Sequence, residues 1–321
     1  MERHENRELN GNLLPSCMIG TWAWGSGING SKMVFGKSYS EEQLMQTFQK
    51  AYELGFIFWD TAEVYGMGSA EKILGKCIEG CKKERQKVLI STKHQPGKRY
   101  KEGEVANAID DSLRRIGVDS IDLYWLHQPY ELQKNMNEMI QCLKRGKIKS
   151  IGLSNCNIAQ IREASSILEQ QGIKLVAVQN HFSLLSIERQ KEIVEYCNKH
   201  HILFFGYMVL EQGALSGNYD VKHPFPLFSM RGLSFGKNKF KKIQALIDYE
   251  RHLANKYGVD VSQIPIAWAI AKQVIPIIGL TKPKHAEALS NGVKIRLSSQ
   301  EIAQLDGLAH NSGVQCKGSW E

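Results

Sequence analysis

Side chains capable of acid–base chemistry follow several short apolar segments of the chain. Asp60, Lys93 and His127 each stand at or just after the end of a β-branched or aromatic segment, and Tyr65 lies shortly beyond Asp60. Further amide and hydroxyl side chains hold equivalent positions: Ser154, Asn155, Gln179, Asn180 and Tyr207. Each residue alone has an ordinary structural explanation. Together they indicate a site at one end of a parallel sheet or barrel, where enzymes of that architecture place their chemistry.

The four residues Asp60, Tyr65, Lys93 and His127 form a coherent acid–base set. A phenol has a pKa of about 10, and a nearby ammonium lowers it by favouring the phenolate. We expect Lys93 to supply that charge to Tyr65, and Asp60 to fix the ammonium through a charge-assisted hydrogen bond. His127 can donate to the oxygen that Tyr65 protonates. The set therefore predicts a general acid for a developing alkoxide, with neither a metal nor a covalent nucleophile.

An acid that protonates an alkoxide requires a hydride donor, and no side chain is one. A nicotinamide cofactor is implied. The side chains of Ser154, Asn155 and Gln179 are suited to holding a carboxamide, and the ring of Tyr207 is suited to stacking on the nicotinamide. Thr281, Lys282 and Lys284 follow the last predicted strand, where barrels commonly bind phosphate. Their charge favours NADP over NAD.

Two other motifs are interpreted as structural. Gly25–Gly30 matches G-x-G-x-x-G, but the next predicted helix begins only at Ser40 and no acidic residue follows at the required distance, so we expect a flexible loop over the barrel. Cys77 and Cys81 are four residues apart, and no second Cys/His pair accompanies them at zinc-finger spacing. We therefore predict no metal site.

The elements that must position these residues alternate between strand and helix. Eight strands are predicted: Cys17–Thr21, Phe56–Asp60, Val88–Thr92, Ile121–Leu126, Ser150–Leu153, Leu175–Gln179, Leu203–Tyr207 and Ile275–Ile278. Predicted helices lie between them, at Ser69–Ile78, Glu104–Ile116, Asn135–Arg145, Asn157–Gln170 and Ile187–His200, besides one that begins at Ser40 and ends before Gly55. The pattern predicts an α/β fold, a (β/α)8 TIM barrel that forms a single domain over residues 1–321.

Three segments depart from the alternation. Arg7–Pro15 is expected to form a hairpin around Asn10-Gly11-Asn12 that plugs the barrel floor. Met208–Phe240 is expected to form a long loop after strand 7, of the kind that serves as a functional lid. The tail Gly313–Glu321 is expected to pack loosely on the surface.

Composition excludes several functional classes. A chain of 321 residues with 42% hydrophobic and 23% charged residues is globular. The net charge of +8 is spread over distant clusters, which favours a solvated surface over nucleic-acid binding. No apolar segment is long enough to span a membrane and no secretory signal is visible. Seven scattered cysteines favour a reducing compartment, so we expect a cytoplasmic protein.

At this point the chain resembles the aldo-keto reductase family over nearly its whole length. The segments that carry the resemblance are Gly20–Trp22, Asp60–Gly66, Ser91–Lys93, Trp125–His127, Gly152–Asn155, Val178–Gln179 and Ile278–Lys282. The resemblance implies an NADP-linked barrel in which Tyr65 is the general acid, Asp60 and Lys93 tune it, and His127 orients the carbonyl. It implies cofactor contacts from Thr21, Trp22, Asp60, Ser154, Asn155, Gln179, Tyr207, Met208, Leu210, Gly213, Gly279, Thr281, Lys282 and His285. It implies substrate contacts from Trp24, Tyr65 and His127.

The cofactor segments depart from the pattern of relatives in two places. Met208-Val209-Leu210 replaces a Ser-Pro-Leu sequence, which leaves backbone contacts to the pyrophosphate but removes a serine hydroxyl. His285 stands where relatives often carry glutamine, and Ala288-Leu289 replace a Glu-Asn pair. The resemblance therefore predicts the catalytic residues more directly than the residues that bind the adenine of the cofactor.

Three functions remain open from the sequence. The first is NADPH-dependent reduction of an aldehyde or ketone. The second is a regulatory or partner protein that binds NADP with little turnover, and the third is a dehydratase or epimerase that keeps the cofactor. Trp22, Trp24, Tyr65 and Trp125 favour a small-molecule carbonyl substrate with an apolar body. The sequence names neither that substrate nor the oligomeric state.

Overall fold

The computed structural model describes residues 7–81, 87–226 and 230–318. Eight parallel strands form a closed barrel in the order β10-β3-β4-β5-β6-β7-β8-β9. They are β3 (Met18–Gly20), β4 (Phe58–Asp60), β5 (Leu89–His94), β6 (Leu123–Leu126), β7 (Ile151–Ser154), β8 (Ala177–His181), β9 (Leu203–Tyr207) and β10 (Ile275–Gly279). Each predicted strand overlaps one of these, so the predicted (β/α)8 barrel is confirmed.

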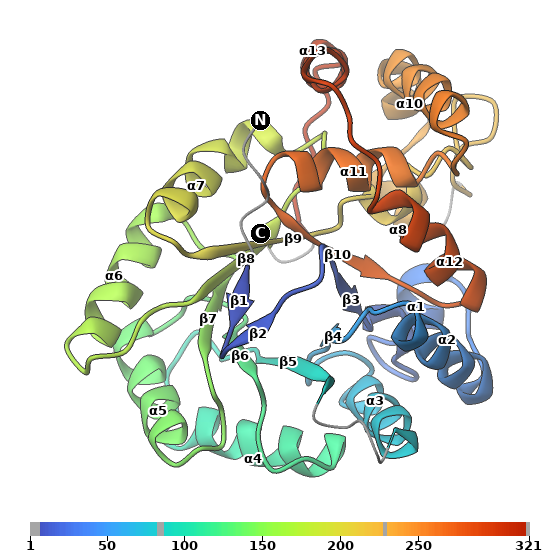
Figure 1. Cartoon of the computed structure of the whole chain (residues 1–321). Coiled ribbons are helices and arrows are strands. Elements are labelled where there is room, and N and C mark those ends of the chain that lie inside the picture. The colour runs from blue at the N-terminus through green and yellow to red at the C-terminus, as the bar shows by residue number, and fades with distance from the viewer. Residues whose placement is uncertain (1–6, 82–86, 227–229, 319–321) are drawn as a thin grey trace.

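Helices surround the barrel (Figure 1). Its outer layer consists of α2 (Glu41–Glu53), α3 (Ser69–Gly80), α4 (Glu104–Ile116), α5 (Leu132–Lys144), α6 (Ile158–Glu169), α7 (Ile187–Lys199), α11 (Gln263–Ala271) and α12 (Pro283–Gly292). Helix α2 begins as predicted, because the Ser40 side chain accepts a hydrogen bond from the Gln43 amide and caps the first turn. Contacts between α12 and α2 close the ring of helices. Helices α10 (Gln244–Tyr257) and α13 (Ser299–Asn311) lie outside this ring.

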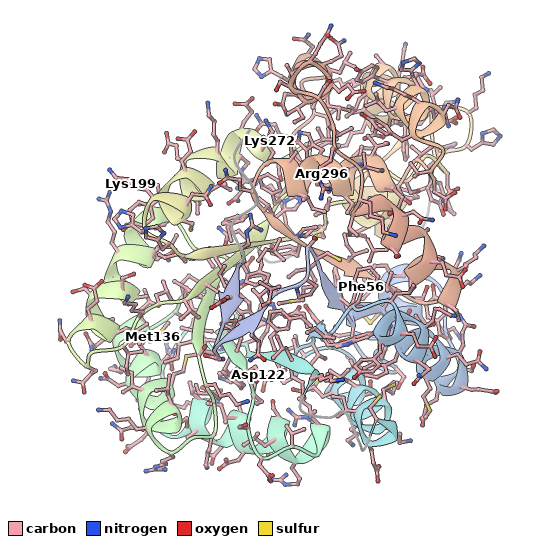
Figure 2. The ribbon with its side chains drawn as sticks, in the orientation of Figure 1. Phe56, Asp122, Met136, Lys199, Lys272 and Arg296 are labelled. Atoms are coloured by element: carbon pink, nitrogen blue, oxygen red, sulfur yellow. The ribbon has the colours of Figure 1, made fainter. Side chains whose placement is uncertain are left out.

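A two-stranded hairpin, β1 (Glu8–Leu9) and β2 (Asn12–Leu13), crosses the amino end of the barrel (Figure 1). Asn10 donates to the carbonyl of Asp122 and accepts from Ser150, and both partners precede barrel strands. Leu9 is buried against the barrel interior. Figure 2 shows Asp122 near this hairpin, whereas Lys199 lies at the outer edge of the ring. The predicted floor plug is confirmed.

The long segment predicted after β9 is present, and short helices interrupt it. It contains the short helices η3 (Glu211–Gly213), α8 (Met230–Ser234) and α9 (Lys237–Lys242). Helices of this length span too few turns to show a 3.6-residue pattern. Phe225, Phe235 and Phe240 pack against one another and give the segment its own apolar cluster.

Hydrogen bonds hold the Gly25–Gly30 segment in place, although a flexible loop was predicted there. Gly30 caps a five-residue helix, α1 (Ser31–Phe35), so the next helix does not wait until Ser40. The Ser26 amide donates to the Ser69 hydroxyl, and Asn29 accepts from the Gly66 amide. These bonds tie the segment to the turn that carries Tyr65.

The tail is also packed more closely than predicted. Val314 and Cys316 are buried, and the Cys316 amide donates to Leu185 at 2.8 Å. The backbone of Gly318 lies so close to the Tyr207 hydroxyl that a side chain at this position would overlap it. The predicted tail extends to Glu321, and its last three residues lie outside the described part of the chain.

Candidate active site

The parallel barrel brings the predicted catalytic side chains to one end. Asp60 ends β4, Lys93 lies near the end of β5, and His127 follows β6. Because neighbouring strands are parallel and in register, with Asp60 opposite Ser91 and Lys93 opposite Trp125, these side chains emerge at the same rim. The two features needed for this placement are the strand order and the shared direction of the strands.

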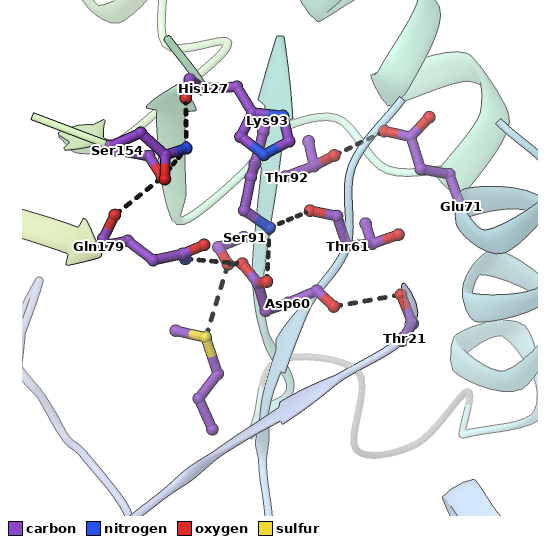
Figure 3. A network of polar contacts seen from close by, with 12 residues as sticks. Thr21, Asp60, Thr61, Glu71, Ser91, Thr92, Lys93, His127, Ser154 and Gln179 are labelled. Atoms are coloured by element: carbon purple, nitrogen blue, oxygen red, sulfur yellow. Dashed lines mark hydrogen bonds and ion pairs between the residues drawn. The ribbon is translucent and has the colours of Figure 1, made fainter. Parts of the chain in front are cut away.

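Asp60 and Lys93 form a buried ion pair, as predicted (Figure 3). The Lys93 Nζ lies 2.5 Å from the Asp60 Oδ2 and donates to the Thr61 carbonyl at 2.7 Å. The other carboxylate oxygen of Asp60 accepts from the Ser91 hydroxyl at 2.6 Å and from the Gln179 amide at 3.3 Å. With no exposed surface on Lys93, the ammonium is fixed in place rather than free on its methylene stem.

The ring of Tyr65 lies beside this pair. The Lys93 Nζ is 5.1 Å from the centroid of the Tyr65 ring. The His127 ring meets the same ring edge-on at 6.4 Å, and Trp22 stacks on it at 6.0 Å. The structure therefore brings Asp60, Tyr65, Lys93 and His127 together.

The pKa of Tyr65 differs in direction from the sequence-based expectation. Burial raises it well above its ordinary value, and the negative charge of Asp60 raises it further. Lys93 does not lower it on balance, because its charge is offset by Asp60 at 2.5 Å and desolvation of a phenolate is costly. The net direction is therefore upward, opposite to the lowering expected from Lys93. Tyr65 is a neutral phenol at neutral pH.

The other two ionisable groups of the site also respond to burial. Burial lowers the pKa of Lys93, while the Asp60 carboxylate acts in the opposite direction. Burial lowers the pKa of His127 well below its usual range, and the positive charge of Lys93 lowers it further. His127 is therefore a neutral imidazole near pH 7, with one ring N–H to donate.

The amide and hydroxyl side chains predicted to hold the cofactor form a connected chain of hydrogen bonds. Asn155 donates to the His127 carbonyl at 2.8 Å and accepts from the Tyr207 hydroxyl at 2.6 Å. Ser154 donates to the Gln179 carbonyl at 2.8 Å. Asn155 has a positive φ of 54°, a conformation that asparagine tolerates better than most residues.

A cavity of about 290 Å³ opens beside this chain of hydrogen bonds, and Ser154 and Asn155 lie outside its wall. Many of the predicted site residues line it: Trp22, Asp60, Tyr65, His127, Gln179, Tyr207, Met208, Leu210, Gly213 and Gly279. Its wall is largely aromatic and apolar, and its volume lies near the lower end for small-molecule sites. The cavity is also lined by four residues that were not predicted from the sequence: Phe35, Lys37, Tyr39 and Arg231. They belong to segments without strand or helix periodicity.

Several predicted residues lie elsewhere. Trp24 is buried, packs on Trp59 and donates to the Leu280 carbonyl at 2.7 Å, so it is part of the core and not of the cavity wall. Thr21 is buried and donates to the Asp60 carbonyl, which makes it a support for the end of β4. Trp125 is enclosed inside the barrel.

Thr281, Lys282 and His285 stand together at the start of α12, beyond the cavity wall. Lys282 is the N-cap residue and is exposed, while the Thr281 carbonyl accepts from Gln43 at 2.5 Å. Burial, followed by the charges of Lys284 and Lys282, lowers the pKa of His285. Near pH 7 the group therefore combines lysine charge with a neutral imidazole.

No three metal-ligating side chains gather in residues 7–81, 87–226 and 230–318. Cys77 lies on α3 and Cys81 caps its end, and neither forms a disulfide. Within the same ranges, no helix has the length and apolar character needed to cross a membrane.

Comparison with known proteins identifies the family to which this barrel belongs, a family of oxidoreductases. Residues 17–310 match the model of the aldo/keto reductase family, and the chain belongs to that family. It is 28% identical to the aldo-keto reductase yakc [NADP(+)] of Schizosaccharomyces pombe, over 91% of this chain and 89% of that protein. It is 30% identical to a chloroplastic pyridoxal reductase of Arabidopsis thaliana, over 92% and 83% of the two chains.

Solved structures share the fold. A glycerol dehydrogenase of Gluconobacter oxydans, 24% identical, aligns with a TM-score of 0.83 over 99% of both chains. An aldo/keto reductase of Klebsiella pneumoniae in complex with NADP and acetate, 25% identical, aligns with a TM-score of 0.71 over 97% of this chain and 96% of its own. The family resemblance stated from the sequence is thus confirmed.

Proposed function

We propose that the protein reduces an aldehyde or ketone to the alcohol with NADPH, and that Tyr65 is the general acid. One observation carries the proposal: the buried Asp60–Lys93 pair lies against the Tyr65 ring, with His127 edge-on to it, at the wall of the cavity. NADPH would supply the hydride, which no side chain can. The protein would supply the proton and hold the carbonyl.

The electrostatics of the site fit a reaction in which NADPH supplies the hydride and the protein supplies the proton. Tyr65 keeps its proton at neutral pH because burial and Asp60 raise its pKa. An alkoxide is a stronger base than a phenolate, so the proton still moves toward it once hydride has been added. Neutral His127 can donate a ring N–H to the same carbonyl oxygen. Asp60 and Lys93 hold a fixed charge pair beneath the phenol and have no exposed route to rearrange.

The residues present fit a nicotinamide cofactor. Tyr207 lines the cavity with a ring whose hydroxyl is tied to Asn155, so its face is fixed for stacking. Gln179 and Trp22 line the cavity as well, together with the segments Met208–Leu210 and Gln212–Gly213. Thr281, Lys282 and His285 would hold the adenosine phosphate. The yakc and Klebsiella relatives, whose names include NADP, support the choice of NADP.

The phosphate assignment has its own test. Lys282→Glu should raise the KM for NADPH far more than the KM for NADH, because only NADPH carries the 2'-phosphate that Lys282 would neutralise. Lys199→Glu, the same charge change at an exposed lysine that ends α7, is the control. Equal effects of Lys282→Glu on both cofactors would remove the assignment.

The experiment that tests the reaction is an NADPH oxidation assay. Absorbance at 340 nm should fall when the protein and NADPH meet members of an aldehyde and ketone panel, and Tyr65→Phe should abolish the fall. Tyr124→Phe is the matched control, because Tyr124 is a buried phenol of β6 that does not line the cavity. A Tyr65→Phe enzyme with full activity would show that another group donates the proton.

The same assay separates the alternatives. Tight NADPH binding without oxidation by any carbonyl would favour the regulatory protein, and product formation without net NADPH consumption would favour the dehydratase or epimerase. We propose aldehydes with apolar bodies as the first substrates to test, because Trp22, Phe35, Tyr39 and Tyr65 line the cavity. The seven cysteines, none of them in a disulfide, fit the cytoplasmic location proposed from the sequence.

A further inference from the structure

Glu211 belongs to the loop that lines the cavity, but its own side chain is buried behind the cavity wall. Its neighbours Leu210, Gln212 and Gly213 line the cavity, whereas Glu211 does not. Its carboxylate is buried, and Oε1 lies 2.7 Å from the His181 Nε2 and accepts from the Ser183 hydroxyl. A carboxylate in this position holds the loop to β8, the strand next to β9.

The backbone around Glu211 requires such support. The φ angles of Met208, Glu211 and Gln212 are 59°, 47° and 53°, so three non-glycine residues within five positions adopt the left-handed conformation. This conformation is unfavourable for L-residues, because Cβ approaches the following carbonyl oxygen. Local bonds, from Glu211 N to Met208 O and from Gly213 N to Leu210 O, close the turns but do not attach them to the barrel. The Glu211 side chain makes that attachment.

The partners of Glu211 belong to the cofactor end of the site. His181 is paired in register with Tyr207, and their rings stack at a centroid distance of 5.8 Å. Ser183 is fully buried and opens the turn that follows β8. The buried Cys316 of the tail is close as well, since burial and then the charge of Glu211 raise the pKa of its thiol. We call Glu211, His181, Ser183 and Cys316 the anchor cluster.

We propose that Glu211 is a positioning residue whose bonds to His181 and Ser183 hold the Met208–Gly213 loop in the shape that binds NADPH. The proposal rests on the proposed function for the cofactor that occupies the cavity. It assigns to Glu211 no contact with substrate or with the reacting atoms. Its loss should therefore weaken cofactor binding while leaving the chemical step nearly intact.

The test compares four variants with the wild-type protein. Glu211→Ala removes the anchor, Ser183→Ala removes one donor to it, and Glu211→Gln keeps an acceptor oxygen for both donors. Glu250→Ala is the control, since Glu250 is an equally buried glutamate on α10, away from the cavity. The readouts are the Kd for NADPH from quenching of tryptophan fluorescence, the KM for NADPH, kcat, and the unfolding temperature.

We expect Glu211→Ala to raise the Kd and KM for NADPH about tenfold, equal to about 1.4 kcal/mol, with kcat within about twofold of wild type. Ser183→Ala should give a smaller increase in the same direction, and Glu211→Gln should restore most of the affinity. Glu250→Ala should change the unfolding temperature without changing the Kd. Rescue by glutamine and a KM effect without a kcat effect are not expected from a general loss of packing.

Several outcomes would overturn the proposal: an unchanged Kd in Glu211→Ala, an equal rise in Glu250→Ala, or a fall in kcat with an unchanged KM. If Glu211→Ala does not fold, Ser183→Ala decides, and a wild-type Kd in that variant counts against the anchor. Wild-type protein that binds NADPH but reduces no carbonyl would refute the proposed function alone, because the Kd comparison still decides on Glu211. Wild-type protein that does not bind NADPH would refute both.

Discussion

Replacing Lys93 by methionine would remove the positive charge from the Asp60–Lys93 ion pair, on which the proposed general acid depends. Methionine keeps the length and apolar character of the lysine stem but removes the ammonium. Asp60 would then keep only its bonds to Ser91 and Gln179, with its charge unpaired in a site where both side chains of the pair are almost fully enclosed. Asp60→Asn creates the opposite situation, because it leaves the ammonium with the Thr61 carbonyl as its remaining partner.

The expected magnitude follows from burial. Removing one partner of a buried ion pair costs about 3–5 kcal/mol, because the remaining charge is left uncompensated. For a chain of 321 residues, with an unfolding entropy of about 2.1 cal/mol/K per residue, that corresponds to a fall in Tm of roughly 4–7 °C. The double variant Asp60→Asn/Lys93→Met carries no charge, and its asparagine can still bond to Ser91 and Gln179. Its loss of stability should therefore be smaller than the sum of the two single losses, by at least about 2 kcal/mol.

The assay is a double-mutant cycle on the free energy of unfolding, measured by urea denaturation and circular dichroism. The exposed pair Lys76–Glu41, with an Nζ to Oε1 distance of 2.7 Å, supplies the control cycle. Water and salt screen that pair, so its coupling should be much smaller. Additive single effects at Asp60 and Lys93 would mean that the two charges do not support each other, and the mechanism would lose its basis.

Three further predictions concern buried groups elsewhere in the site and the barrel. Both Glu250 oxygens lack a hydrogen-bond partner among the described residues, and burial raises the pKa of this carboxyl well above its usual value. The unfolded chain releases this proton above about pH 4.5 while the folded chain keeps it, so Glu250→Leu should stabilise the protein by about 1–3 kcal/mol at pH 7 and by less at pH 5 in urea unfolding. Because the pKa of His127 is lowered, the unfolded chain binds a proton at His127 below about pH 6.5 and the folded chain does not. The Tm of the wild-type protein should therefore fall more between pH 7.5 and pH 5.5 than the Tm of His127→Asn. Equal falls in Tm would contradict this prediction. Gly152→Ala would place Cβ inside the Trp125 ring and should lower stability by about 1–3 kcal/mol, whereas Gly307→Ala, with open space around it, should not lower it; similar losses in both would be inconsistent with the barrel packing.

The cluster of candidate catalytic residues could be predicted from sequence because its positions follow from local patterns. Asp60, Lys93 and His127 stand at or just after the ends of apolar segments, and segments that alternate with helices must run parallel. Parallel strands place such residues on one rim, whatever the details of packing. The hairpin around Asn10 and Gly11 was equally local, since its turn chemistry is carried by adjacent residues.

The remaining wall of the cavity could not be predicted in this way. Phe35, Lys37, Tyr39 and Arg231 come from segments whose side-chain pattern has no period, and they meet the barrel only through long-range packing. Arg231, for example, reaches the carbonyls of Gln212 and Phe35 across large separations in the chain. Trp24 is the opposite case: it was predicted to contact the substrate, but its ring packs on Trp59 and donates to the Leu280 carbonyl in the core.

By itself, the sequence determined the barrel, the order of its strands and the identity of the residues at its rim, because these depend on periodicity and chain direction. Only the tertiary structure decided the direction of the Tyr65 pKa shift and the role of Glu211. Both depend on burial and on partners from other strands: Asp60 beside Lys93 in the first case, and His181 and Ser183 in the second. Desolvation and charge pairing arise only when distant segments enclose a group, and no local pattern of residues specifies that enclosure.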